Sequence, residues 1–148
     1  MPLLNHVGIT VSNLERSIAF YTSLGLGAPP ADWIFTIQGH WLSQLVQEED
    51  AVIRVAFLPI DDGSVLELLE YQQPEGEKAN TRPNRDVGAM HLALNVDNID
   101  EAYQRLSAAG VPFNSEPQTV AMGPWAGNRV AYLSDPDGTP VELVMNVV

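Results

Sequence analysis

The chain contains the same segment twice, which restricts its fold to arrangements built from two similar modules. The run from His6 to Glu15 (HVGITVSNLE) matches the run from His91 to Asp100 (HLALNVDNID), and the two copies stay in register as far as Gly25 and Gly110. A second match follows, between DGSVLEL at 62–68 and DGTPVEL at 137–143. Each copy therefore supplies one histidine near its beginning and one glutamate near its end.

Length and composition predict one domain made of these two modules. The chain has 148 residues, of which 45% are hydrophobic, so it can bury a substantial core. Modules of about seventy residues are too small to expect strong independence. We therefore predict a single domain over 1–148, with module 1 at 3–72, a connector at 73–86 and module 2 at 87–148.

Charge and cysteine content exclude several classes of function. The net charge of -12 and the pI near 4.3 oppose binding to nucleic acid or to an anionic membrane surface. The absence of cysteine excludes disulfides, a thiolate nucleophile and cysteine-ligated zinc. The sequence shows neither a signal-peptide pattern nor an apolar run near the length that spans a bilayer. We expect a soluble cytoplasmic protein.

Hydrophobic periodicity predicts a strand and then a helix in each copy. His6, Gly8 and Thr10 alternate with apolar residues, and the segment after His91 repeats this period of two. Residues 12–15 (SNLE) have the form of a capping box, Asp97 is the corresponding N-cap, and a glycine ends each helix. The predicted apolar stripes are Leu14, Ile18 and Tyr21 in the first helix and Ile99, Tyr103 and Leu106 in the second.

Further strands are expected after each helix, which makes the fold class α+β. The polar stretch Gln73–Asp86 contains two prolines and a glycine and is the predicted surface connector. Residues 38–50 fit either a short helix or a loop. The predicted strands are Trp33–Ile37, Val52–Leu58 and Val65–Tyr71 in the first copy, and Val111–Phe113, Arg129–Ser134 and Thr139–Met145 in the second.

Strand alternation and the repeat together select the candidate site residues. Glu67 and Glu142 occupy matched positions, whereas Glu70 points to the opposite face of its strand and is expected to face solvent. A carboxylate in an apolar strand is costly to bury unless it is paired or coordinates a cation. A lone histidine at a strand end is usually only a partly exposed polar residue, but the matched pairs favour a metal site. The candidate ligands are His6, Glu67, His91 and Glu142, whereas the unmatched His40 is expected in a loop or at a pocket rim.

Three motifs resemble the vicinal oxygen chelate superfamily, which includes glyoxalase I, methylmalonyl-CoA epimerase, extradiol dioxygenases and fosfomycin-resistance proteins. The motifs are H-x-G-x-x-V-x-N-L-E-R-S-I-x-F-Y from residue 6 with L-G-L at 24–26, MHLALNVDN at 90–98, and DPDG-x-x-VEL at 135–143. The resemblance covers essentially the whole chain. It implies two tandem βαβββ modules whose curved mixed sheets enclose a metal-binding cleft, commonly in a homodimer. The cleft is closed either within one chain or between modules swapped between chains.

The resemblance also implies which residues hold the metal. His6, Glu67, His91 and Glu142 fall on the four ligand positions of bacterial glyoxalase I, although Leu69 replaces a threonine of that pattern. Extradiol dioxygenases and fosfomycin-resistance enzymes use two histidines and one glutamate, which would be His6, His91 and Glu142. Glu67 therefore discriminates between these alternatives. The match of residues 66–70 to methylmalonyl-CoA epimerase is partial.

Two imidazoles and two carboxylates suit one divalent ion among Ni, Co, Zn, Mn and Fe. Such an ion can act as a Lewis acid toward a small-molecule carbonyl substrate and stabilise an enediolate, while Glu142 or Glu67 removes the α proton. This predicts a metal-dependent lyase or isomerase, like glyoxalase or an epimerase. The alternatives are an Fe(II)-dependent extradiol-type dioxygenase and a small-molecule binding or resistance protein.

Five further side chains have two possible roles each. Trp33, Trp41 and Trp125 either line an aromatic pocket or pack in the core, which is the commoner fate of tryptophan. Arg82 and Arg85, in the connector, either meet an anionic part of a substrate or are solvated, as connector arginines usually are.

Overall fold

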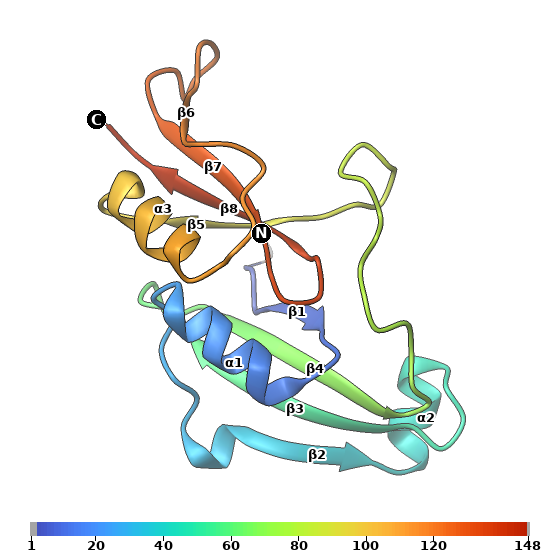
Figure 1. Cartoon of the computed structure of the whole chain (residues 1–148). Coiled ribbons are helices and arrows are strands. Elements are labelled where there is room, and N and C mark those ends of the chain that lie inside the picture. The colour runs from blue at the N-terminus through green and yellow to red at the C-terminus, as the bar shows by residue number, and fades with distance from the viewer. Residues whose placement is uncertain (1–2, 148) are drawn as a thin grey trace. The chain divides into compact units, whose positions relative to one another are not determined.

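The computed structural model describes residues 3–147, which divide into two compact units after Ala79 (Figure 1). The division lies inside the predicted connector. Each unit contains an open, mixed four-stranded sheet, and the predicted α+β class is confirmed. Within residues 3–147, no helix is long and apolar enough to cross a membrane.

Unit 1 has the predicted βαβββ order with one additional helix. Its sheet has the strand order β1-β4-β3-β2, in which β1 is parallel to β4 and the other neighbours are antiparallel. The segment left open between helix and loop forms α2. The elements are β1 (Val7–Thr10), α1 (Leu14–Ser23), the 3-10 turn η1 (Ala31–Trp33), β2 (Ile34–Gln38), α2 (His40–Val46), β3 (Val52–Pro59) and β4 (Val65–Gln73).

Unit 2 repeats this topology with the strand order β5-β8-β7-β6. Its elements are β5 (Leu92–Asn95), α3 (Ile99–Ala108), β6 (Gln118–Thr119), β7 (Arg129–Ser134) and β8 (Pro140–Met145). The predicted strand at Val111–Phe113 is reduced to an isolated bridge between Phe113 and Leu133 of β7. The Asn114 N–H donates to the Tyr132 carbonyl and the Ser134 N–H to the Pro112 carbonyl, but Pro112 has no N–H to continue the ladder. Gln118 and Thr119 form the strand beside the other end of β7.

The N-cap of each long helix lies one residue after the predicted N-cap. The N-cap of α1 is Asn13, whose side chain accepts a hydrogen bond from the Arg16 N–H at 2.8 Å. The N-cap of α3 is Asn98, which accepts from the Glu101 N–H at 3.1 Å. The prediction of Ser12 and Asp97 as N-caps is therefore wrong in both copies. The residue types could not decide between the two positions, because asparagine is as strong an N-cap as serine or aspartate. The predicted glycines do follow the helices, with positive φ values of 108° at Gly25 and 83° at Gly110.

The buried stripe of each helix has a small residue at its centre. The fully or largely buried positions are Leu14, Ser17 and Tyr21 in α1 and Ile99, Ala102 and Leu106 in α3. The predicted stripe residues Ile18 and Tyr103 are only half-buried. The small side chains of Ser17 and Ala102, at matched positions, allow each helix to pack close to its sheet.

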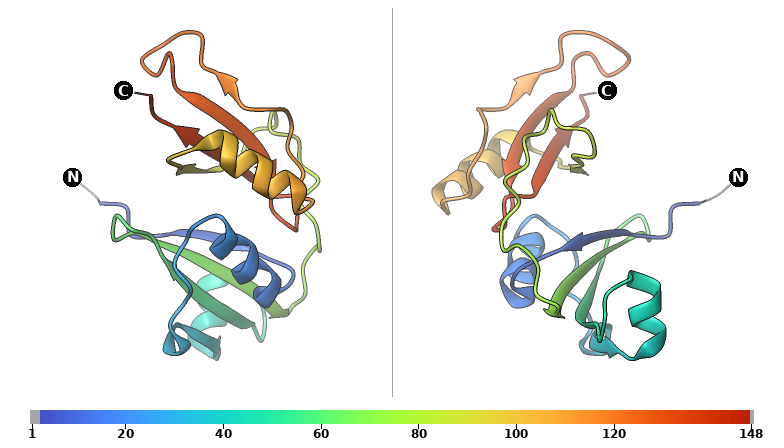
Figure 2. Two further views of the ribbon diagram at one scale, coloured as in Figure 1. Left: turned by 60° about the vertical axis from the view of Figure 1, so that its left-hand side comes forward. Right: turned by 90° about the vertical axis from the view of Figure 1, so that its right-hand side faces the viewer.

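The two faces of the sheet in unit 1 are covered by different helices (Figure 2). One face packs against α1, and its Leu66 and Leu68 are fully buried. On the other face, Leu42 of α2 packs against Ile53 and Val55. Glu67 lies on this second face, because it follows Leu66 in a strand whose side chains alternate.

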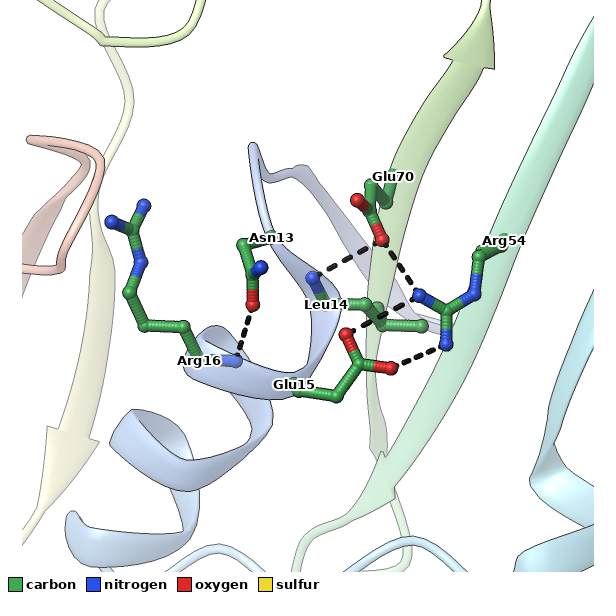
Figure 3. Close-up of polar contacts among 6 residues, drawn as sticks. All are labelled: Asn13, Leu14, Glu15, Arg16, Arg54 and Glu70. Atoms are coloured by element: carbon green, nitrogen blue, oxygen red, sulfur yellow. Dashed lines mark hydrogen bonds and ion pairs between the residues drawn. The ribbon is translucent and has the colours of Figure 1, made fainter.

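Glu70 does not face solvent, contrary to the prediction. Its carboxylate accepts hydrogen bonds from the Leu14 N–H, at 3.3 Å, and from the Arg54 guanidinium, at 3.1 Å (Figure 3). Arg54 also pairs with Glu15 in the first turn of α1, and this hydrogen bond lowers the pKa of Glu15. Glu70 thus places a negative charge at the positive N-terminus of α1 and joins the helix to β3 and β4.

We predict that Glu70→Gln lowers the free energy of unfolding of the metal-free protein by about 1–2 kcal/mol, because charge-assisted hydrogen bonds to Arg54 and Leu14 are lost. Glu67→Gln, the same change three residues away on the other face, should stay within about 0.5 kcal/mol of the parent. Urea unfolding followed by circular dichroism measures both. Equal losses in the two variants would contradict the structural role of Glu70.

The connector lies on the surface and becomes attached to unit 2 at Asn80. Residues 74–86 are exposed, and the Asn80 N–H donates to the Asp137 carbonyl at 2.6 Å. A Cβ on Gly138 would collide with the Asn80 backbone, so glycine is required for this close approach. The segment before Asn80 includes Lys78, whose ammonium pairs with the exposed Glu75 carboxylate at 2.9 Å.

Lys78 is the only lysine in the sequence, so a lysine-specific protease has one site. We predict that this protease cuts the native protein rapidly after Lys78, because the backbone there is exposed. Mass spectrometry of a digestion time course measures the cleavage. Resistance of the native protein, with rapid cleavage only after urea is added, would show that the connector is held down.

Candidate functional site

The first candidate pair is assembled by the parallel pairing of β1 with β4. This register sets Gly8 opposite Glu67, and His6 lies two residues before Gly8, on the same side of the chain. The His6 Nε2 and Glu67 Oε2 atoms are 3.1 Å apart. The Glu67 side chain is 17% exposed, so it is accessible but largely enclosed by protein.

The second pair is built in the same way in unit 2. The parallel register of β5 and β8 sets Ala93 opposite Glu142, with His91 two residues earlier. His91 Nε2 and Glu142 Oε2 are also 3.1 Å apart, and the Glu142 side chain is also 17% exposed. The structure thus brings each predicted histidine to the predicted glutamate of its own module.

The side chain of Asn5 orients the ring of His6. The Asn5 Oδ1 atom lies 2.7 Å from His6 Nδ1. In the tautomer in which Nδ1–H donates to Asn5, the Nε2 lone pair points at the Glu67 carboxylate. In this tautomer the Nε2 atom and the carboxylate are two acceptors that one shared metal ion can bind.

The residue beside each glutamate on the neighbouring strand differs between the modules. Phe57 is paired with Glu67, and its ring packs against the rings of Trp33 and Phe35. Tyr132 is paired with Glu142, and its hydroxyl lies 3.2 Å from His91 Nε2. Burial raises the pKa of Tyr132, and the negative charge of Glu142 raises it further, so the hydroxyl stays protonated at neutral pH.

Sequence reasoning did not identify Tyr132. The signal was available, because Phe57 and Tyr132 both stand ten residues before the glutamate of their module. Within residues 3–147, no three histidine, aspartate or glutamate side chains gather in a metal-binding arrangement, so each module shows a pair of candidate ligands.

Of the other singled-out side chains, Trp33 lies near the first pair, because its ring packs against Phe57, which neighbours both His6 and Glu67. His40 begins α2 and lines a pocket of 780 Å³ in unit 1, in agreement with the expected pocket rim. Of the two roles left open for the tryptophans, core packing does not apply, because Trp33, Trp41 and Trp125 are between 38% and 74% exposed.

Comparison with known proteins gives matches over nearly the whole chain. Residues 3–143 match the model of the glyoxalase, bleomycin resistance protein and dioxygenase superfamily. A 2-epi-5-epi-valiolone epimerase from an Actinomyces species is 33% identical over 144 residues, which cover 95% of this chain and 78% of the relative. A lactoylglutathione lyase from Salmonella typhimurium is 29% identical over 146 residues, which cover 95% of this chain and 90% of the relative.

A crystal structure of a glyoxalase family protein from Bacillus cereus has the same fold. It superposes with a TM-score of 0.83 at 23% identity and covers 98% of this chain and 94% of its own. The repeated βαβββ topology and the family match agree with the resemblance carried by the three sequence motifs. The chain belongs to the glyoxalase, bleomycin resistance protein and dioxygenase superfamily, whose members are also known as vicinal oxygen chelate proteins.

Proposed function

We propose that the protein binds one divalent metal ion through His6, Glu67, His91 and Glu142 and transfers a proton at the carbon next to a substrate carbonyl. The observation that carries this proposal is the occurrence of two imidazole–carboxylate pairs with the same 3.1 Å separation. In both pairs the histidine side chain is exposed and the glutamate side chain is 17% exposed, and imidazoles with carboxylates suit the ions Ni, Co, Zn, Mn and Fe.

A site with all four ligands requires both modules. We propose that they come together either within one chain or between two copies in a homodimer. Neither pair is sufficient alone, because one imidazole and one carboxylate leave most coordination positions of a divalent ion to solvent.

A bound divalent ion would withdraw electron density from the substrate carbonyl and make the neighbouring C–H bond more acidic. The protein must then accept the proton and return it. Glu67 and Glu142 are the candidate bases, because each carboxylate is largely enclosed by protein but keeps some exposure and lies beside the histidine of its module. Tyr132 lies beside Glu142 and orients that carboxylate, whereas Phe57 gives Glu67 an apolar neighbour.

The relatives favour lyase or isomerase chemistry. Both an epimerase and a lactoylglutathione lyase match over nearly the whole chain, and epimerisation beside a carbonyl is a proton transfer. The presence of Glu67 as a fourth ligand would leave too few positions for a catecholate and dioxygen together. We therefore place the reaction among lyases and isomerases acting on small carbonyl compounds, with an extradiol-type dioxygenase as the alternative.

We predict that the metal-loaded protein exchanges a substrate C–H proton with deuterium from the solvent. Glu67→Gln or Glu142→Gln should slow this exchange by roughly two to four orders of magnitude if the changed residue is the base. Proton NMR in heavy water, with a panel of hemithioacetals, acyl thioesters and hydroxyketones, measures the exchange. Glu70→Gln is the matched control, because Glu70 lies on the opposite face and should leave the exchange rate unchanged.

An oxygen electrode distinguishes the alternative reaction. The proposal expects no oxygen uptake by the iron-loaded protein in the presence of catechols. Rapid, catechol-dependent oxygen consumption would overturn the lyase or isomerase assignment and favour the dioxygenase.

A further inference from the structure

Unit 2 contains a polar cavity, distinct from the pocket in unit 1, and its lining includes neither His91 nor Glu142. It has a volume of 400 Å³ and lies between residues 80–84 of the connector and the ends of β7 and β8. Its polar lining residues can all donate hydrogen bonds through their side chains: Asn80, Thr81, Arg82, Asn84, Asn114 and Ser134.

The charge of this cavity is opposite to that of the chain. The sequence has 19 acidic and 7 basic residues, yet the cavity lining includes an arginine and no aspartate or glutamate. A guanidinium among amide and hydroxyl side chains, with no acidic residue in the lining, is suited to a carboxylate or phosphate group.

The connector side of the cavity is held in place by backbone contacts. The Asn80 N–H donates to the Asp137 carbonyl, and the Asn80 side chain accepts from the Arg82 N–H at 3.1 Å. Arg82 Nη1 donates to the Val87 carbonyl at 3.2 Å, and this bond uses one of the five N–H groups that a guanidinium carries.

The cavity borders the candidate site along the same face of the sheet. Ser134 and Pro140 form a cross-strand pair, and the next pair on that face is Tyr132 with Glu142. Two residues along a strand correspond to about 7 Å, so one substrate a few carbon atoms long reaches from Glu142 into the cavity.

We propose that this cavity binds the anionic group of the substrate, so that the substrate class is a small carbonyl compound that carries a carboxylate or phosphate. This inference rests on the proposed function for the position of the carbonyl, but the anion site itself is testable without turnover. Arg82 is then a specificity-determining residue, and Arg85, which does not line the cavity, provides the matched control.

The first test measures binding alone. Inorganic phosphate, and in a parallel series acetate, is titrated into the metal-free protein and followed by ¹H–¹⁵N NMR. We expect saturable shifts at the backbone and side-chain amides of Asn80, Asn84 and Asn114.

Arg82→Gln should weaken this binding by about 10- to 100-fold, the effect of losing a hydrogen bond to a charged group, and Arg85→Gln should not. Shifts that are absent from these residues, or equal in the two variants, would overturn the anion site. The tighter of the two probes identifies phosphate or carboxylate as the preferred group.

The second test compares two ketones that differ in the anion. We expect the metal-loaded protein to exchange the C–H protons of dihydroxyacetone phosphate with a higher kcat/KM than those of dihydroxyacetone. Arg82→Gln should remove most of this preference by raising the KM for the phosphorylated ketone, whereas Arg85→Gln should leave the preference unchanged. An equal preference for the phosphorylated ketone in Arg82→Gln and Arg85→Gln would overturn the substrate class and leave the proposed function standing.

If the protein catalyses C–H exchange in neither these ketones nor any other carbonyl compound, the proposed function fails. The phosphate titration then still decides whether the anion site exists.

Discussion

The parallel pairing of the first and last strands of each module is the constraint on which the candidate site depends. In a parallel register, the beginning of β1 lies beside the beginning of β4, and the same holds for β5 and β8. A histidine just before the first strand therefore meets a glutamate early in the last strand. A shift of one residue would turn the glutamate to the opposite face. The equal separations in the two pairs reflect equal registers in the two sheets.

Packing against the long helix, α1 in unit 1 and α3 in unit 2, helps to fix that register. In unit 1, α1 packs on Leu66 and Leu68, and the Glu70 carboxylate joins the helix N-terminus to Arg54. In unit 2, Arg129 pairs with Asp100 in the first turn of α3, at positions matched to Arg54 and Glu15. These contacts lie on the face of each sheet that packs against α1 or α3. The opposite face carries the paired histidine and glutamate, and in unit 1 it also packs against α2 through Leu42, Ile53 and Val55.

The sequence predicted the fold well where the information is local or repeated. Alternation identified the strands that carry His6 and Glu67, and the repeat selected Glu67 over Glu70. Contacts between distant segments were not predictable in this way. The partner of Glu70 is Arg54, sixteen residues away, and the neighbour of Glu142 is Tyr132, on another strand. Strand register depends on packing across the whole sheet, and the local pattern at Val111–Phe113 carries no information about which segment pairs with β7.

The central claim is that the two imidazole–carboxylate pairs hold a single ion together. The most direct test is X-ray absorption spectroscopy of the cobalt-loaded protein, combined with the metal-to-chain ratio from elemental analysis. The account predicts one ion per chain with two imidazoles in its coordination shell, and loss of that ion from either His6→Ala or His91→Ala. Two ions per chain, each with one imidazole, or retention of a single ion after removal of either histidine, would contradict it.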